Sequence, residues 1–290
     1  MAGCGRIGFD PPAEVLAPDA AAPLGVPLIS VDPGSLPPFG NIRLVTELSS
    51  AADDDDPCLR RDQLEVFFDS FRGGNDDLWV SHRASVVDAW SVPVPLAEIN
   101  SLASEEHPSI ARDGLTLYFT SDRGGDANVW FSKRVDVSSP FGAPSQVADV
   151  NTMAEDRMGS IDALDQSLFL SSTRDSPGAD QLYEARRSTA GEAWSPPALV
   201  AEIVASAGDP SVHVDDRGVA MYLVQNNNAT KDLFWTTRPM AGAPWAATVP
   251  VAELNTGVSE SDPWLSPALR VIYFVRDDGV GTKDIYMATR

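Results

Sequence analysis

An aromatic residue recurs at nearly constant intervals along this chain of 290 residues. The steps between successive aromatics are 51, 51, 53 and 51 residues, and the five positions are Phe39, Trp90, Phe141, Trp194 and Trp245. A repeat of this length constrains the architecture before any secondary structure is assigned, because each copy must be one structural unit that stacks on its neighbours.

Two further series keep these intervals closely. One consists of apolar triplets rich in β-branched and aromatic residues, which are typical of buried strands. The triplets begin at Val66, Leu117, Leu168, Met221 and Ile272. The other series predicts a third strand in each unit and begins at Asp77, Asn128, Gln181, Asp232 and Asp284. Each unit therefore contains four short strands in roughly 40–50 residues, which is the size of a propeller blade.

The two ends of the chain complement each other. The last unit stops at Arg290, directly after its third strand, whereas Phe39 has no three strands before it. We therefore predict an all-β fold, a five-bladed β-propeller of four-stranded antiparallel blades that spans residues 37–290. The N-terminal strand, at about residues 39–48, completes the last blade and closes the ring, which leaves no unpaired strand edge at that seam.

One segment carries a recognisable motif. It runs through residues 105–114 and 117–125, where it includes Ser121-Asp122-Arg123-Gly124-Gly125, and ends at Asn128-Val129-Trp130. This segment resembles the TolB-type, WD-repeat-like β-propeller repeat of bacterial envelope proteins. The resemblance covers about residues 37–290 and implies the propeller fold. It also implies an envelope protein as a partner, but one fold hosts many activities.

The N-terminal segment differs in composition from the repeats. Residues 1–36 are rich in proline and alanine, which predicts an extended, disordered tether. The start Met1-Ala2-Gly3-Cys4 resembles the end of a bacterial lipoprotein signal. That resemblance implies lipidation at Cys4 and a lipid-anchored protein of the bacterial cell envelope, periplasmic or surface-exposed.

The charge of the chain excludes some partners. Asp and Glu number 42 against 21 Lys and Arg, which gives a net charge of −21. Such a surface disfavours nucleic acid, which needs clustered cations, and it disfavours a membrane except through a lipid anchor. We expect a monomer. We also expect no cofactor or metal, since the two cysteines, Cys4 and Cys58, match no zinc-type cluster.

In four of the five blades a carboxylate lies three residues before the start of the predicted first strand. They are Asp54, Glu105, Asp156 and Glu260, and the fourth blade has Asp209 two positions later. Because innermost strands surround the channel of a propeller, these acids could form an electronegative ring at one mouth. They could instead be framework residues that hydrogen-bond loop amides, and we favour this interpretation because most copies share the feature. The run 53–56, four aspartates, is expected to be a solvated acidic turn.

The blades also differ near the same mouth, and those differences are candidates for ligand binding. They are His107, Arg157, Asp209, His213 and Trp264. Trp264 could stack on a sugar ring or pack against its neighbour. The sequence shows no helical zinc motif, nucleophile elbow or phosphate loop.

Three functions fit these observations. The main prediction is a non-enzymatic binding or scaffold protein that holds a protein, peptide or glycan at one mouth of the channel. The first alternative is a glycan-processing enzyme, resembling a glycoside hydrolase, which would need two mouth carboxylates, one with a raised pKa. The second alternative is a purely structural envelope protein.

Overall fold

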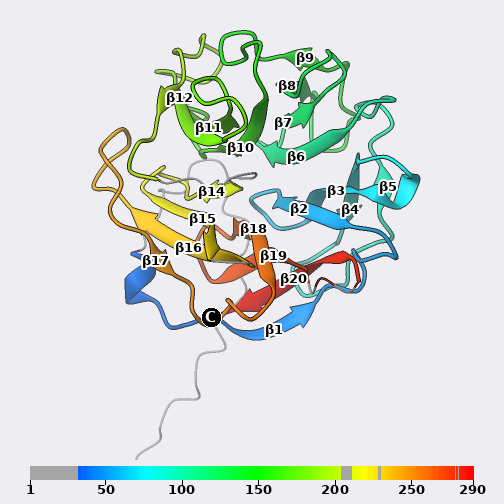
Figure 1. Ribbon diagram of the computed structural model, residues 1–290. Helices are drawn as coiled ribbons and strands as arrows, with labels where there is room; N and C mark the ends of the chain where they lie inside the picture. The colour runs from blue at the N-terminus through cyan, green and yellow to red at the C-terminus, as the bar shows by residue number, and fades with distance from the viewer. Residues whose placement is uncertain (1–31, 204–210, 228–229, 278, 280) are drawn as a thin grey trace, which may run out of the picture.

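The computed structural model describes residues 32–203, 211–227, 230–277, 279 and 281–290. The chain forms five four-stranded antiparallel sheets arranged in a ring, a five-bladed β-propeller (Figure 1). The short helix η1 (Pro33–Ser35) precedes the ring, and η2 (Phe71–Gly73) follows the second strand of the first blade. Within the described residues, no helix is long and apolar enough to cross a bilayer.

Each of the first four blades is built from four consecutive strands. The first blade contains β2 (Asp54–Leu59), β3 (Glu65–Ser70), β4 (Asp77–His82) and β5 (Val94–Pro95), and the second contains β6 (Glu105–Ile110), β7 (Thr116–Ser121), β8 (Asn128–Lys133) and β9 (Ser145–Gln146). The third blade contains β10 (Asp156–Ile161), β11 (Ser167–Ser172), β12 (Gln181–Arg186) and β13 (Ala198–Leu199), and the fourth contains β14 (Val212–Val214), β15 (Ala220–Asn227), β16 (Thr230–Thr237) and β17 (Val249–Pro250). The first strand of each lies nearest the central axis (Figure 1).

The fifth blade joins the two ends of the chain, as the sequence predicts. It contains β18 (Ser259–Leu265), β19 (Val271–Asp277) and β20 (Lys283–Thr289), and its outer strand is β1 (Gly40–Leu44). β1 pairs antiparallel with β20, with Leu44 opposite Tyr286. The closing strand is shorter than the predicted 39–48, because residues 46–48 form a turn in which the amide of Leu48 donates to the carbonyl of Val45.

The five recurring aromatics have one structural role. Each lies beneath the guanidinium of an arginine that follows the third strand, with the guanidinium carbon 4.0–4.6 Å from the ring centre. The Nε–H of each arginine also donates to a carbonyl in the turn between the first two strands, at 2.6–2.7 Å. The pairs are Arg83–Trp90, Arg134–Phe141, Arg187–Trp194, Arg238–Trp245 and Arg290–Phe39. The cation therefore joins the outer edge of each blade to its inner turn.

The pair Arg290–Phe39 explains why the ends of the chain belong together. Its two residues come from opposite ends, yet they repeat the contact that the other four blades make internally. Phe39 is buried, and its amide donates to Glu253 Oε1 at 2.9 Å. Closure therefore completes both a sheet and the guanidinium–aromatic contact of the last blade.

Deleting residues 37–48 removes β1 and Phe39 and exposes the edge of β20. We expect the product to be insoluble or molten, because the edge of β20 is left open and Arg290 loses the aromatic ring on which it stacks. Thermal unfolding followed by circular dichroism is the measurement, with a chain lacking only residues 1–31 as the control. A cooperative transition at an unchanged temperature in the 37–48 deletion would contradict the closure.

Candidate active site

Four carboxylates of the predicted ring lie inside the blades. Asp54, Glu105, Asp156 and Glu260 are each 0% exposed. Glu105 shows the pattern: Oε1 accepts hydrogen bonds from the Ser121 hydroxyl and from Arg123 Nη2, both at 2.8 Å, and Oε2 accepts the Ser101 amide at 2.8 Å. In the other three blades the arginines are Arg72, Arg174 and Arg276. The structure therefore places these four acids in the shared framework and not at the channel mouth.

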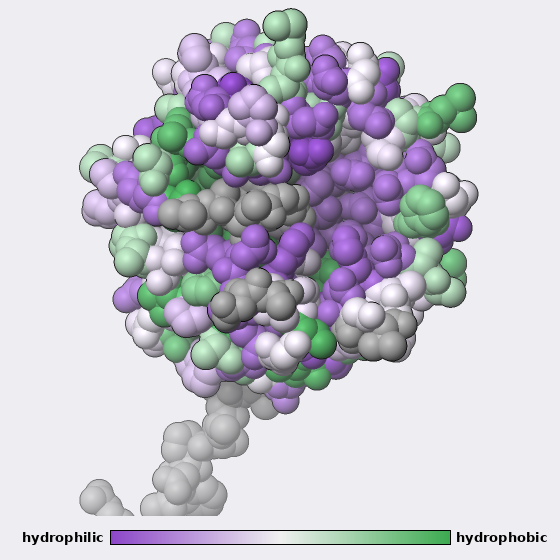
Figure 2. Space-filling model, viewed as in Figure 1, coloured by the Kyte–Doolittle hydropathy of each residue, from purple (hydrophilic) through white to green (hydrophobic). Residues whose placement is uncertain are grey.

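In the first three blades the residue after the framework acid lines the channel mouth instead, because side chains alternate along a strand. A cavity of about 590 Å³ lies at this mouth and holds Asp55, Glu106 and Arg157 at that position. Hydrophilic side chains cover this part of the surface (Figure 2). The other lining residues are Asp53, Asp56, Asp69, Phe71, Asp76, His107, Asp180, Lys231, Asp262 and Lys283.

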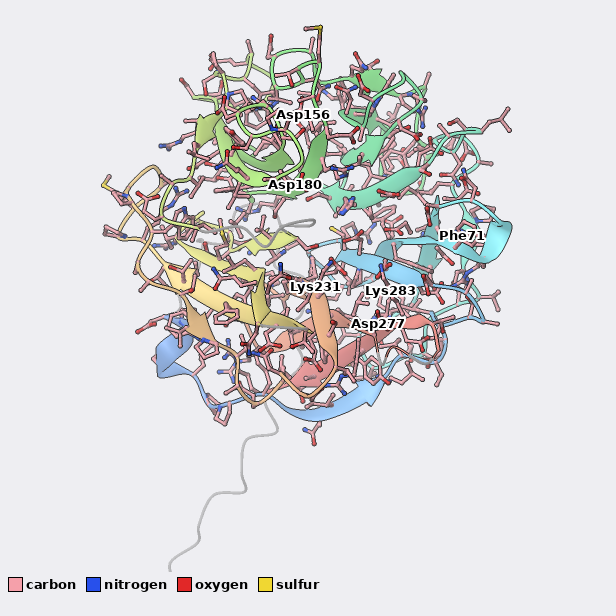
Figure 3. The ribbon with its side chains drawn as sticks, in the orientation of Figure 1. Phe71, Asp156, Asp180, Lys231, Asp277 and Lys283 are labelled. Carbon is pink, nitrogen blue, oxygen red and sulfur yellow. The ribbon has the colours of Figure 1, made fainter. Side chains whose placement is uncertain are left out.

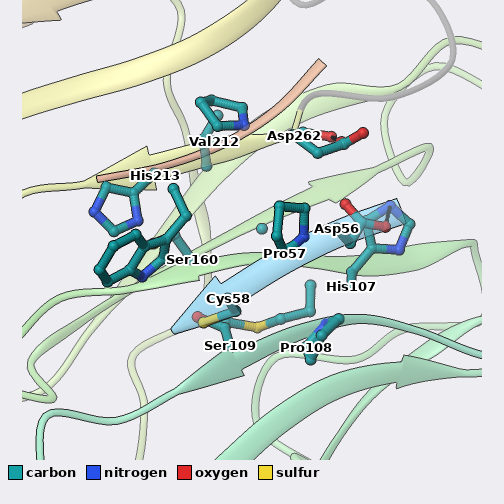
Figure 4. A pocket seen from close by; sticks show the side chains of 15 residues that line it. Asp56, Pro57, Cys58, His107, Pro108, Ser109, Ser160, Val212, His213 and Asp262 are labelled. Atoms are coloured by element: carbon teal, nitrogen blue, oxygen red, sulfur yellow. Dashed lines mark hydrogen bonds and ion pairs between the residues drawn. The ribbon is translucent and has the colours of Figure 1, made fainter. Parts of the chain in front are cut away.

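Three prolines on the innermost strands direct a second set of side chains toward the channel. Pro57, Pro108 and Pro263 have no N–H for the strand ladder, and each innermost strand there has a register shift typical of a β-bulge. The residue before each proline takes a positive φ of 51–53°. These residues are Asp56, His107 and Asp262, and their side chains lie toward one end of the channel pocket, away from His213 (Figure 4). Strained backbone of this kind is concentrated at functional sites.

The first blade contains a pair of acids that the other described blades lack. Asp55 on β2 lies directly opposite Asp69 on β3. Opposed like charges destabilise a sheet, and both residues are buried, with exposed fractions of 9% for Asp55 and 5% for Asp69. The corresponding pairs elsewhere are Glu106 with Thr120, Arg157 with Ser171 and Ser261 with Val275. The fold does not require two opposed acids here.

The environments of the two acids differ. Burial raises the pKa of Asp69 to about 7, although His107 and a side-chain hydrogen bond with Asp56 oppose this rise. Burial, Asp262 and Asp69 also raise the pKa of Asp55, and the ammonium of Lys283, 2.6 Å from Asp55 Oδ2, opposes the rise. Among the described residues, neither Asp55 Oδ1 nor Asp69 Oδ1 has a hydrogen-bond partner. Both oxygens are buried acceptors without a donor, which adds to the cost of ionising these two acids.

A third acid faces this pair from the last blade. Asp262 is 7% exposed, and its two carboxylate oxygens accept hydrogen bonds from the hydroxyls of Ser211 and Ser261. The serines fix its orientation at the bulge. The charge of Asp262 contributes to the raised pKa values of both Asp55 and Asp69, so the three carboxyls share one site.

The remaining predicted residues separate into three groups. His107 and Arg157 line the cavity, where Arg157 contacts Glu155 at 2.8 Å and Asp180 at 3.4 Å. His213 and Trp264 lie deeper in the channel, with ring centres 5.8 Å apart. Burial lowers the pKa of His213 to about 4, so it is neutral at physiological pH. Asp209 and Cys4 lie outside the described residues.

Sequence reasoning missed the acids of the first blade. The run 53–56 was expected to be a solvated turn, but Asp54–Asp56 lie on β2, and Asp54 and Asp55 are buried. The positions that match Asp69 in the other four repeats are occupied by Thr120, Ser171, Val224 and Val275, so an alignment of the second strands would have revealed this acid.

In the described part of the chain, no group of three His, Cys, Asp or Glu residues is arranged to hold a metal.

Comparison with known proteins finds similar folds among solved structures. No protein-family model and no curated protein matches the chain. The crystal structure of TolB from Acinetobacter baumannii is similar, with a TM-score of 0.52 and 14% identity over 84% of this chain and 55% of that one. This chain thus spans about half the length of that TolB. The fold is a TolB-like β-propeller, as the sequence motif predicts.

Glycoside hydrolases share the fold over more of their length. A GH62 hydrolase in complex with xylotriose has a TM-score of 0.58 and 14% identity, covering 83% of this chain and 92% of that one. A thermostable family-43 glycoside hydrolase has a TM-score of 0.54 and 13% identity, covering 83% and 90%. At such identities the likeness shows the fold alone.

The comparisons and the cavity together correct two predictions. The chain was expected to be a non-enzymatic binding or scaffold protein and to have no catalytic activity. Several of the similar structures are glycoside hydrolases, and the mouth carries buried acids of unequal environment instead of a repeated ring. The glycan-processing alternative is therefore favoured over the main prediction.

Replacing Asp69 by Asn is expected to stabilise the protein at high pH. The folded-state pKa of about 7 lies above the unfolded value near 3.9, so this carboxyl lowers stability progressively as the pH rises from about 4 to about 7. The free energies of unfolding of Asp69→Asn and wild type should differ little at pH 4. They should differ by on the order of a few kcal/mol at pH 8.

Urea unfolding at the two pH values is the measurement. The control is Asp88→Asn, which removes a charge from an exposed loop outside the cavity. A stability difference for Asp69→Asn that does not change between pH 4 and pH 8 would contradict the raised pKa.

Proposed function

We propose that this protein is a glycan-processing enzyme, a glycoside hydrolase on a five-bladed propeller. The observation that carries the proposal is the buried pair Asp55–Asp69 in the mouth cavity, with Asp262 facing it from the last blade. Glycosidic hydrolysis needs one carboxyl that holds a proton near neutral pH and another that acts as base or nucleophile.

Asp69 suits the role of general acid. Its pKa of about 7 leaves it partly protonated at neutral pH, and its free oxygen Oδ1 belongs to a residue that lines the cavity. In the proposed step Asp69 gives its proton to the bridging oxygen of the glycoside, and the bond between that oxygen and the anomeric carbon breaks. The leaving sugar departs as an alcohol.

Asp262 suits the role of base. A water adds its oxygen to the anomeric carbon and gives a proton to the carboxylate of Asp262, which the two serine hydroxyls hold in place. One water is consumed and the charges balance, since Asp69 ends ionised and Asp262 protonated. Proton exchange with solvent restores both groups. Lys283 and Asp55 act as positioning residues, because the ammonium holds the carboxylate beside Asp69.

Similar structures support the choice of a glycan. The GH62 hydrolase holds xylotriose, and the α-L-arabinofuranosidase from Podospora anserina holds cellotriose, each on a fold that matches more than four-fifths of this chain. The cavity of about 590 Å³ has room for a small sugar segment. Lipidation at Cys4 and a place at the cell envelope remain predictions that would bring such an enzyme to envelope or external glycans.

Asp69→Asn and Asp262→Asn are each expected to lower hydrolysis by about 10²–10⁴-fold, because each removes one proton-transfer group. The measurement is release of reducing ends from a panel of xylo-, arabino- and cello-oligosaccharides and amino-sugar oligomers. Asp88→Asn should keep wild-type activity. Wild-type protein that releases no product from any glycan, or an Asp69→Asn variant of full activity, would contradict the proposal.

A further inference from the structure

One aromatic ring at the mouth cavity is exposed to solvent. Phe71, on η2, is 48% exposed, and it is the one exposed aromatic residue in the part of the chain that the structure describes. It lines the same cavity as Asp55, Asp69 and Asp262. A ring that stays half in water keeps much of its apolar area out of the core, so the fold gains far less from Phe71 than from the buried aromatics of the repeat.

The other blades have polar residues at this position. Asp122 Oδ1 accepts a hydrogen bond from the amide of Ser104 at 2.9 Å. In the last blade Asp277 Oδ1 accepts the amide of Gly279 at 2.7 Å. A phenylalanine side chain cannot make such a bond, so the first blade, which contains the buried acid pair, has an exposed ring in place of a loop-binding group. The residues that match Phe71 in the repeat are Asp122, Thr173, Asn226 and Asp277.

The backbone around Phe71 is fixed independently of its side chain. The amide of Phe71 donates to the carbonyl of Asp53 at 3.0 Å, and its carbonyl accepts the amide of Gly74 at 2.9 Å. The guanidinium carbon of the next residue, Arg72, lies 5.0 Å from the ring centre of Trp79. The loop therefore presents a preorganised ring, which lowers the entropy cost of binding, and the same contacts hold the loop when the ring is removed.

Phe71 lies on the leaving-group side of the proposed reaction. It follows Asp69 by two residues, just after the end of β3, and it lies farther from the channel centre than Lys231 and Lys283 (Figure 3). The acid that protonates the bridging oxygen and the base that activates water lie on opposite sides of the scissile bond. With Asp69 as the acid and Asp262 as the base, the departing sugar extends from Asp69 along the first blade, toward Phe71.

We propose that Phe71 is a specificity-determining residue that stacks on the leaving-group sugar of an oligosaccharide substrate. The negative face of the aromatic ring attracts the C–H groups on one face of a pyranose, and the contact removes apolar surface of both from water. The inference rests on the proposed function for the direction of the sugar chain. It makes an oligosaccharide a better substrate than a glycoside whose leaving group is not a sugar.

Kinetics on substrates with and without a leaving-group sugar test this subsite. The first kind are tetramers of xylose, plain and arabinosylated, of glucose and of N-acetylglucosamine. The second kind are the fluorides of arabinose, xylose, glucose and N-acetylglucosamine in both anomeric forms, which leave no sugar to stack. We expect the ratio of kcat/KM for a tetramer to kcat/KM for the fluoride to fall about tenfold in Phe71→Ala.

Three further variants identify the ring as the cause. Phe71→Leu keeps an apolar side chain without a flat ring and should show the same fall, and it replaces Phe71→Ala if that variant fails to melt cooperatively. Phe71→Trp should keep the wild-type ratio, because it restores an aromatic face. Met153→Ala is the control, since it shortens an apolar side chain that is 95% exposed outside the cavity, and it should leave the ratio unchanged.

The results separate this inference from the proposed function. An unchanged ratio in the folded Phe71 variants, an equal fall in Met153→Ala, or cleavage of fluorides without cleavage of any tetramer overturns the subsite and leaves the hydrolase standing. If wild-type protein cleaves neither kind of substrate, the hydrolase is overturned, and titration calorimetry with the tetramers tests the subsite. Binding that is about tenfold weaker in Phe71→Ala then supports it, whereas equal affinity or no binding overturns it.

Discussion

The stacking of an arginine guanidinium on an aromatic ring is the contact on which the ring of blades depends. It occurs in all five blades, and in each the same arginine also binds the carbonyl of the inner turn. Some of these cations reach a neighbouring blade as well, as Arg134 does with Glu65 and Arg238 with Glu184. A planar, permanently charged group can make all these contacts at once, which an ammonium cannot.

A regular framework leaves function to the positions where blades differ. Framework acids such as Glu105 already accept hydrogen bonds from arginine, hydroxyl and amide donors of their own blade. They therefore serve the fold and not a ligand. Asp55 and Asp69 break the pattern because they are opposed, buried and each left with one oxygen unpartnered in the described structure. Such a pair lowers stability at neutral pH, which is a common property of catalytic sites.

Much of the fold could be predicted from the sequence, because large aromatics and apolar triplets mark blade positions regardless of their neighbours. The blade count and the closure through Phe39 followed from spacing alone, and both are confirmed. The site could not be predicted equally well. Whether Asp54 or Asp55 faces the channel depends on strand phase, and the bulges at Pro57, Pro108 and Pro263 turn a further residue inward. The raised pKa of Asp69 arises from burial and from carboxyls distant in sequence.

The central claim is that the mouth cavity holds a carboxyl able to donate a proton near neutral pH. Carbon-13 NMR of the aspartate carboxyl groups, followed as a function of pH, tests it most directly. The account predicts one aspartate signal with a pKa of about 7 that is missing from Asp69→Asn. If every aspartate carboxyl titrates below pH 5, Asp69 is not the proton donor and the proposed chemistry is contradicted.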